Sequence, residues 1–264
     1  MLSLLCVLVL APVAFVVAGI VALLTAFSYW RLSLRYPSEG GTVEFLNIAF
    51  GTGILTGALN ILLCMSYVIL LAVYAYAFGA YGANFFPAAD FAFWKHALLS
   101  AVIVLLAIIN WFGVDVAIRS ENLFNGLKLI LLALFVAVGF STPMEWSRVA
   151  PDTWVGPLQL VAGSMVIFLN YEGFELIANA SNSMRNPRRS LPIAYLGGVA
   201  VVILIYVLIA LVVVGHLDFP AIAQDPDATL SLAAHAFMGT GGAIMIAIAA
   251  MLAGTACGLA AYWL

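Results

Sequence analysis

Charged residues are scarce in this sequence: they make up 8% of the 264 residues, whereas 66% are hydrophobic. Soluble domains usually carry about a quarter charged residues, so this composition excludes a soluble globule. Residues 1–30, 45–89 and 190–217 contain no Asp, Glu, Lys or Arg. A helix needs roughly 20 apolar residues to cross the hydrocarbon core of a bilayer, and its backbone must satisfy its hydrogen bonds internally. The chain is therefore predicted to be an all-α, multi-pass membrane protein.

Cysteine and histidine are also rare. Cys6, Cys64 and Cys257 all lie in apolar runs, which is typical of small buried hydrophobic side chains and not of a disulfide framework or a metal site. No Ser/His/Asp set, phosphate-binding loop or metal-ligand spacing stands out, so we predict no enzyme activity, no cofactor and no bound metal. The basic residues form no patch beyond a few loop arginines, which excludes nucleic acid as a partner.

Seven transmembrane helices are predicted from the apolar runs. They cover residues 11–30, 54–81, 96–113, 122–140, 156–180, 191–215 and 242–264. Residues 43–50 are predicted to form an interfacial helix, and residues 229–237 a short amphipathic stretch after a turn at 225–227. The loops are short, so we expect a single transmembrane domain over residues 1–264.

Basic residues collect in alternate loops and predict the orientation. Seven of them fall on one side of the membrane: Arg31, Arg35, Arg119, Lys128, Arg185, Arg188 and Arg189. The other side holds only two basic residues, Lys95 and Arg148, together with several acidic residues. The positive-inside rule places the seven in the cytoplasm of a cell that carries the protein in its plasma membrane. Residue 1 then lies outside the cell, and the sequence stops at residue 264 within or just after a helix. We therefore expect the sequence to be truncated at both ends.

The fifth span contains a polar stretch. Residues 166–175 read Val-Ile-Phe-Leu-Asn-Tyr-Glu-Gly-Phe-Glu, with apolar residues on both sides. Charges at membrane depth are costly and are usually retained for a function or a buried partner. Gly173, between Glu172 and Glu175, is a place where the helix can break, and transporters use such breaks near the midplane to hold substrates and ions. The alternative is a tilted helix that carries both carboxylates into water at its end.

Lys128 is the second candidate residue. It lies about six residues inside the predicted cytoplasmic end of the fourth span, a depth of roughly 9 Å. Its ammonium either snorkels to the membrane surface or occupies a cation position between helices. Tyr67 repeats with Tyr74 and Tyr81 every seven residues in the second span. Such a stripe is more typical of packing than of a ligand wall, and Tyr67 is kept as a candidate substrate contact.

At several points the sequence resembles amino-acid permeases of the amino acid–polyamine–organocation (APC) superfamily. Residues 26–37 with Glu39-Gly40-Gly41 are similar to the end of that family's second helix. Residues 110–113 and 125–129 look like its fourth-helix end and fifth-helix start. Residues 168–175 are similar to its broken sixth helix, and residues 185–192 to the K-N-P-x-R-x-x-P loop that follows. This loop is the most specific match.

The resemblance implies part of a LeuT-like fold of two inverted five-helix repeats, in which the seven spans correspond to family helices two to eight. The family's glycine-rich first helix and its helices from the ninth onward have no counterpart here. Substrate would lie where the sixth helix unwinds. The implied substrate-binding residues are Phe168, Asn170, Tyr171, Gly173, Phe174 and Tyr67. In relatives that do not use sodium, the lysine matching Lys128 takes the position of sodium, so the coupling and proton candidates are Lys128, Glu172 and Glu175.

Two functions from different classes follow. The first is a secondary active transporter of amino acids or related amines, predicted to be sodium-independent and able to couple to protons. The second is a truncated, non-transporting membrane subunit or scaffold that keeps only the fold. The expected partners are a small-molecule substrate and the lipid bilayer, while association with a second copy or a partner subunit stays open.

Overall fold

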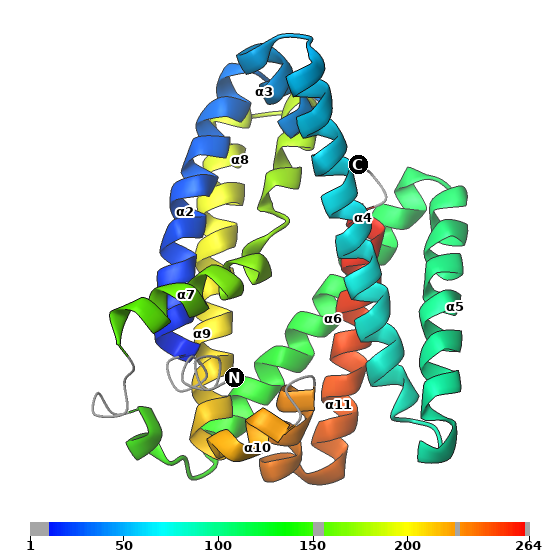
Figure 1. The fold of residues 1–264 in the computed structure, drawn as a ribbon, viewed down its shortest axis with the longest axis vertical. Coiled ribbons are helices and arrows are strands. Elements are labelled where there is room, and N and C mark those ends of the chain that lie inside the picture. Colours follow the sequence, from blue (N-terminus) through cyan, green and yellow to red (C-terminus); the bar gives the residue numbers. More distant parts are fainter. Residues whose placement is uncertain (1–10, 150–155, 225–227, 262–264) are drawn as a thin grey trace. The chain divides into compact units, whose positions relative to one another are not determined.

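The computed structural model describes residues 11–149, 156–224 and 228–261. Every regular element in these ranges is a helix (Figure 1). Within them, 7 helices are long and apolar enough to cross a membrane. They are Ala11–Arg35, Ile54–Ala83, Phe91–Trp111, Val116–Ser141, Pro157–Ser183, Pro187–His216 and Thr229–Leu259. The predicted all-α bundle of seven spans is confirmed, while the predicted turn at 225–227 lies outside the described residues.

The helices follow one another along the chain with short connections. The α-helices are α2 (Ala11–Arg35), α3 (Gly41–Phe50), α4 (Ile54–Ala83), α5 (Phe91–Trp111), α6 (Val114–Ser141), α7 (Pro157–Phe168), α8 (Pro187–Pro192), α9 (Gly198–His216), α10 (Phe219–Gln224) and α11 (Thr229–Ala261). Short 3-10 helices connect them: η1 (Ala88–Asp90), η2 (Trp146–Val149), η4 (Leu169–Tyr171) and η5 (Phe174–Ser183). A π-helical turn, η6 (Ile193–Gly197), joins α8 to α9.

Contacts between the helices divide the chain into two compact units. Unit 1 comprises Met1–Asn60 and Met144–Gln224, and unit 2 comprises Ile61–Pro143 and Asp225–Leu264. Unit 1 therefore holds α2, α3 and α7 to α10, whereas unit 2 holds most of α4 together with α5, α6 and α11. The expectation of one transmembrane domain over residues 1–264 stays a prediction.

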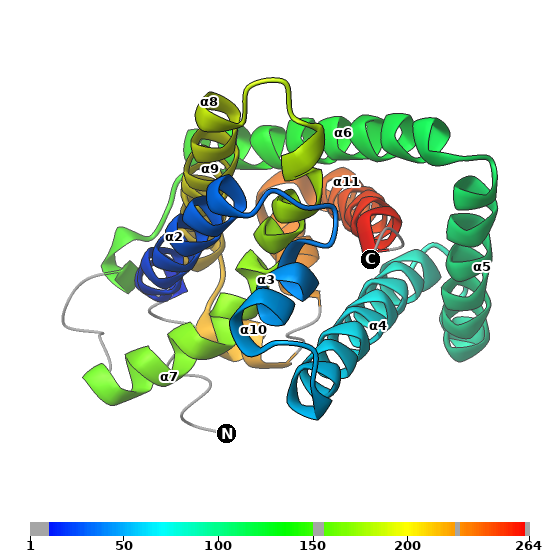
Figure 2. The ribbon, with the colours of Figure 1, turned by 90° about the horizontal axis from the view of Figure 1, so that it is seen from above.

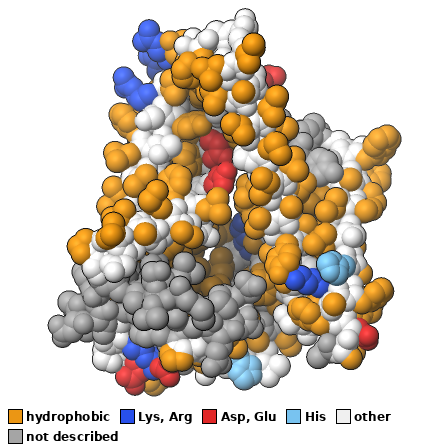
Figure 3. All heavy atoms as spheres, viewed as in Figure 1, with side chains coloured by type: hydrophobic (Ala, Val, Ile, Leu, Met, Phe, Trp, Pro, Cys, Tyr) orange, Lys and Arg blue, Asp and Glu red, His pale blue; other side chains and the backbone are white. Residues whose placement is uncertain are grey.

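The outer surface of the long helices is apolar (Figure 3). Leu24 on α2 is 66% exposed, Ile61 on α4 is 63% exposed and Ile130 on α6 is 66% exposed. Large side chains of this kind are stable on a surface that faces lipid, where burial against other helices has no hydrophobic advantage. The exposed apolar surface is what a membrane-spanning bundle requires.

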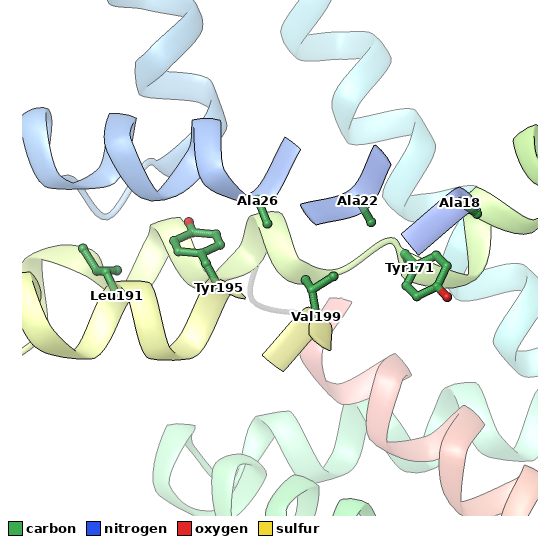
Figure 4. Packing of buried hydrophobic residues seen from close by; sticks show 7 residues of the cluster. All are labelled: Ala18, Ala22, Ala26, Tyr171, Leu191, Tyr195 and Val199. Carbon is green, nitrogen blue, oxygen red and sulfur yellow. The ribbon is translucent and has the colours of Figure 1, made fainter. Parts of the chain in front are cut away.

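Small residues on α2 build the core of unit 1. Ala18, Ala22 and Ala26 recur every fourth residue, share one face of the helix and are almost fully buried. They pack in one cluster with Tyr171, Leu191, Tyr195 and Val199 (Figure 4). A Cβ added at Gly19 would lie 2.5 Å from Cγ1 of Ile203 on α9. This close approach brings α2 alongside α9 (Figure 2), as small residues do in membrane helices.

Unit 2 is packed in the same way around α11. Its buried cluster contains Ala75, Val102, Leu106, Ala117 and Leu259. A Cβ at Gly258 would lie 2.6 Å from Cδ1 of Leu106, and one at Gly254 would lie 3.0 Å from the carbonyl oxygen of Tyr74. Two α11 glycines therefore let α4 and α5 approach this helix closely.

One predicted boundary needs correction. The fourth span was predicted to start at residue 122, but α6 begins at Val114, because the charged residues that resembled a loop form its first turns. Lys128 consequently lies in the middle of α6, while its depth in the membrane stays a prediction. The predicted separation of the stretch 229–237 from the last span is confirmed, because α11 consists of two helices that meet at a kink at Gly239, with φ 67° and ψ −159°. A helix at 43–50 is confirmed as α3.

Candidate substrate site

The fifth span is broken in the structure at the place where the sequence predicts a break. The α-helix α7 ends at Phe168 and continues as the 3-10 turn η4. Glu172 then takes an extended conformation with φ −58° and ψ 146°. Gly173 follows with φ 116° and ψ −20°, a left-handed conformation that favours glycine. The chain resumes as the 3-10 helix η5, and Figure 1 shows α7 and the following segment as separate pieces.

Side chains hold the backbone at the break. Oε2 of Glu175 accepts a hydrogen bond from the Gly173 N–H at 2.8 Å, so this carboxylate satisfies an amide that an unbroken helix would have paired internally. The Asn170 side chain donates to the Ile167 carbonyl at 3.1 Å, and the Asn170 carbonyl accepts the Tyr206 hydroxyl at 3.1 Å. The polar residues that mark the break in the sequence are therefore partly used to maintain it.

An aromatic group packs on the α7 side of the break. Tyr171 is 4% exposed and donates its hydroxyl proton to the Phe15 carbonyl on α2 at 2.8 Å. Its ring centroid lies 6.5 Å from that of Phe15 and 5.5 Å from that of Tyr206. Tyr171 thus joins the break to α2 and α9 within the core of unit 1.

A second aromatic group packs on the η5 side. The Phe174 ring meets the Tyr29 ring edge-on, with centroids 5.9 Å apart, and Tyr29 also lies 6.4 Å from Tyr195. The Tyr29 hydroxyl is 3.2 Å from the hydroxyl of Thr42 at the start of α3. The Ser33 and Tyr195 hydroxyls are hydrogen-bonded at 3.0 Å where both side chains are fully buried. Tyrosines with bonded hydroxyls therefore flank the broken span on both sides.

Lys128 lies on a polar face of α6 in unit 2. Glu121, Asn125 and Lys128 are spaced four and three residues apart, so they share one side of the helix. The Asn125 amide donates to Oε1 of Glu121 at 3.5 Å, and Glu121 interacts electrostatically with Lys128. All three side chains are half-buried. Lys128 is thus part of a polar stripe that includes a carboxylate.

The structure brings some of the predicted site residues together. Phe168 and Phe174 pack against the core cluster that contains Tyr171, while Asn170, Glu172, Gly173 and Glu175 form the break itself. Tyr67, which is 9% exposed, and Lys128 belong to unit 2. The break was predicted, but its partners Tyr206 and Phe15 were missed. Only the presence of a tyrosine in an apolar span marks Tyr206 in the sequence, and nothing local marks Phe15.

No group of three or more His, Cys, Asp or Glu side chains that could hold a metal ion occurs in residues 11–149, 156–224 and 228–261. The polar groups present at the break are backbone amides and carbonyls, the Asn170 side chain and the carboxylates of Glu172 and Glu175. Such discontinuous helices are how membrane transporters build sites at bilayer depth.

Seven apolar spans in the described residues, one of them broken by a polar stretch, define an α-helical multi-pass membrane protein. The family model described as "Amino acid permease" matches residues 2–264, and the chain belongs to this family. The expected membership is confirmed.

Three curated relatives are similar in sequence to this chain over most of its length. The chain is 33% identical over 241 residues to an uncharacterized protein of Methanocaldococcus jannaschii, covering 91% of this chain and 55% of that protein. It is 29% identical to the inner membrane transport protein YbaT of Escherichia coli, covering 91% of this chain and 56% of YbaT. It is 28% identical to the methylthioribose transporter of Bacillus subtilis, covering 78% and 48%. The chain spans about half the length of these relatives.

Proposed function

We propose that the protein carrying this chain is a secondary active transporter of amino acids or related amines. The observation that carries the proposal is the break at Glu172 and Gly173 inside an otherwise apolar span. A break of this kind presents backbone N–H and C=O groups to a ligand at membrane depth. The family description supports this function. One relative is named for methylthioribose, so the substrate class is proposed from the site and not from the family.

In the proposed site, backbone carbonyls at the break accept the ammonium group of the substrate. The Asn170 carbonyl already accepts the Tyr206 hydroxyl, but a carbonyl oxygen has two lone pairs and accepts a second donor. Phe168, Tyr171 and Phe174 supply apolar walls for the substrate side chain. Tyr67 is kept as a proposed substrate contact on the ground of the sequence alone.

The two carboxylates take different roles in this proposal. Glu175 accepts a hydrogen bond from the Gly173 amide at 2.8 Å, so we propose that it stabilises the conformation of the break. Glu172 interacts electrostatically with Glu175 and is the proposed proton carrier of the pair. Removal of Glu175 should therefore affect folding, whereas removal of Glu172 should affect coupling.

Lys128 is proposed to make transport independent of sodium. A fixed positive charge in the middle of α6 repels a second cation by Coulomb's law. Its electrostatic partner Glu121 lies two turns away on the same helix face. We propose that this pair keeps the lysine ammonium inside the bundle and prevents it from snorkelling to the surface.

The proposed orientation places the basic loops in the cytoplasm of a plasma-membrane protein. In unit 1, the end of α2 and the start of α8 line one pocket, so two of the basic loops share a side of the bundle. Toward the other end of α9, Arg148 pairs with Asp218, and the Glu145 N–H donates to the Gly215 carbonyl at 3.0 Å. This distribution supports the positive-inside assignment.

Uptake of labelled amino acids and amines into proteoliposomes, with sodium replaced by choline, tests the proposal. We expect uptake to persist without sodium and to be lost in Lys128→Ala. Lys95→Ala is the matched control, because Lys95 is the other lysine of the chain and donates to the Tyr76 hydroxyl at 2.7 Å. Uptake that stops without sodium, or full uptake by Lys128→Ala, would refute the coupling role. A folded protein that takes up none of these compounds would be a non-transporting scaffold.

A further inference from the structure

A pocket of about 410 Å³ lies in unit 1 where α2 ends and α8 begins. From the α2 side it is lined by Ser33, Leu34 and Pro37, and from the α8 side by Asn186, Pro187, Arg188 and Arg189. Pockets that hold small ligands measure about 300–1,000 Å³. The volume is therefore large enough for a small polar ligand.

The lining is suited to an anion. Arg188 and Arg189 present two guanidinium groups, whose planar N–H donors bind phosphate oxygens in pairs. Both arginines are exposed, and no acidic residue is among the described residues that line the pocket. Ser33 contributes a fully buried hydroxyl that is bonded to Tyr195 at 3.0 Å. A phosphate group here would meet two positive charges and no carboxylate.

The pocket lies at the boundary between apolar and polar parts of the chain. One candidate span ends at Arg35, and another begins at Pro187, so the lining residues sit where two spans leave the hydrocarbon layer. Figure 3 shows basic side chains at this end of unit 1, next to a largely apolar surface. This is the depth at which lipid headgroups lie.

Apolar side chains continue from the pocket along the same helices. Ile193 follows Arg189 by one turn on the same helix side and is 71% exposed. Phe27 lies two turns before the lining residue Leu34 on the same side of α2 and is 47% exposed. A free phosphate ion would make no use of these side chains, whereas the acyl chains of a lipid would cover them. The combination favours a lipid over a soluble anion.

We propose that this pocket binds the phosphate headgroup of an anionic membrane lipid. Arg188 and Arg189 hold the phosphate, and the acyl chains run along the exposed apolar side chains of α2 and of the helix that begins at Pro187. A bound lipid connects the end of α2 to the start of α8, the segment that follows the broken span. The site is separate from the proposed substrate site and does not depend on the transport proposal.

Binding of a fluorescent phosphatidylglycerol to the purified chain in detergent tests the proposal, with the same fluorophore on phosphatidylcholine as the reference lipid. We expect phosphatidylglycerol to bind more tightly than phosphatidylcholine. Each arginine near a membrane surface contributes about fivefold to the binding of an acidic lipid, so Arg188→Gln with Arg189→Gln should weaken it about thirtyfold. Arg119→Gln is the matched control, because Arg119 is an exposed arginine of α6 that does not line the pocket.

Three outcomes would overturn the proposal. The first is equal binding of both lipids, and the second is unchanged phosphatidylglycerol binding in the double variant. The third is displacement of the lipid by inorganic phosphate at an equal concentration, because a site that also contacts acyl chains should bind the lipid more tightly than the free anion. If the double variant does not fold, Arg188→Lys with Arg189→Lys keeps both charges. It should then bind phosphatidylglycerol more weakly than the wild type but more tightly than it binds phosphatidylcholine, and loss of that preference would also contradict the proposal.

Discussion

Gly173 gives the most direct physical test of the break, through the substitution Gly173→Ala. The residue has φ 116°, a conformation that costs a residue with a Cβ atom about 1–3 kcal/mol. Nothing lies within 4 Å of a Cβ built at this position. The expected cost is therefore purely conformational, with no steric collision to add to it.

Gly198→Ala is the matched control for this substitution. Gly198 is a helical glycine of the same unit with φ −59° and ψ −53°, and nothing lies within 4 Å of its added Cβ either. Alanine in a helix is more stable than glycine by about 0.5–1 kcal/mol. The two substitutions thus make the same chemical change in open space, but their effects on stability should have opposite signs.

Thermal unfolding in detergent, followed by the fluorescence of the 6 tryptophans, measures both effects. A change of 1 kcal/mol shifts the melting temperature by about 2–4 °C for a chain of this size. Gly173→Ala should therefore melt about 2–12 °C below the wild type, given the conformational cost of about 1–3 kcal/mol, and Gly198→Ala should melt at or slightly above it. If both variants melt at or above the wild-type temperature, the helix is continuous at Gly173 and the proposed site does not exist.

Three further substitutions test the contacts around the break and in unit 2. Glu175→Ala leaves the Gly173 amide without its acceptor and should lower the free energy of unfolding by about 1–3 kcal/mol. Glu175→Gln keeps an acceptor oxygen and should recover most of this stability. Equal melting temperatures of the two variants would contradict the role of Glu175 as the acceptor of the Gly173 amide. Tyr195→Phe removes the buried bond to Ser33 and should lower stability by about 1–3 kcal/mol. Tyr36→Phe, which removes an exposed bond to Arg35, should change little, so a similar loss in both would argue against the buried bond. Gly79→Ala would bring a Cβ within 2.5 Å of the Lys95 carbonyl oxygen and should cost about 1–3 kcal/mol. Gly57→Ala, where the added Cβ meets open space in the same helix, should melt at or slightly above the wild type. Equal melting of these two variants would contradict the close packing of α4 on α5.

Hydropathy was sufficient to predict the seven spans, because crossing a bilayer demands a long apolar run. The same reasoning misplaced the start of α6. Asp115, Arg119 and Glu121 resemble a loop by composition, yet a helix can extend past the apolar layer and keep charges in its first turns. Lys128 was consequently placed about six residues inside the start of the predicted span, whereas it lies in the middle of α6.

The break was predictable for a local reason, whereas its supporting contacts were not. A glycine between carboxylates in an apolar run is unfavourable for a continuous helix, and that information lies within a few residues. The bonds from Tyr206 to Asn170 and from Tyr171 to Phe15 join residues separated by 36 and 156 positions. Such contacts depend on how α2, α7 and α9 pack, which periodicity in a single sequence does not specify.

The central claim is that the broken span binds an amino acid or amine, and substrate protection of a cysteine at the break tests it most directly. Asn170 is exposed, so Asn170→Cys, made after Cys6, Cys64 and Cys257 are replaced by Ser, offers one thiol to an alkylating reagent. Val201→Cys is the control, because Val201 on α9 is 55% exposed and not at the break. We predict that a transported amino acid or amine slows alkylation at position 170 and leaves position 201 unchanged. Equal alkylation rates at position 170 with and without every such compound would contradict the account.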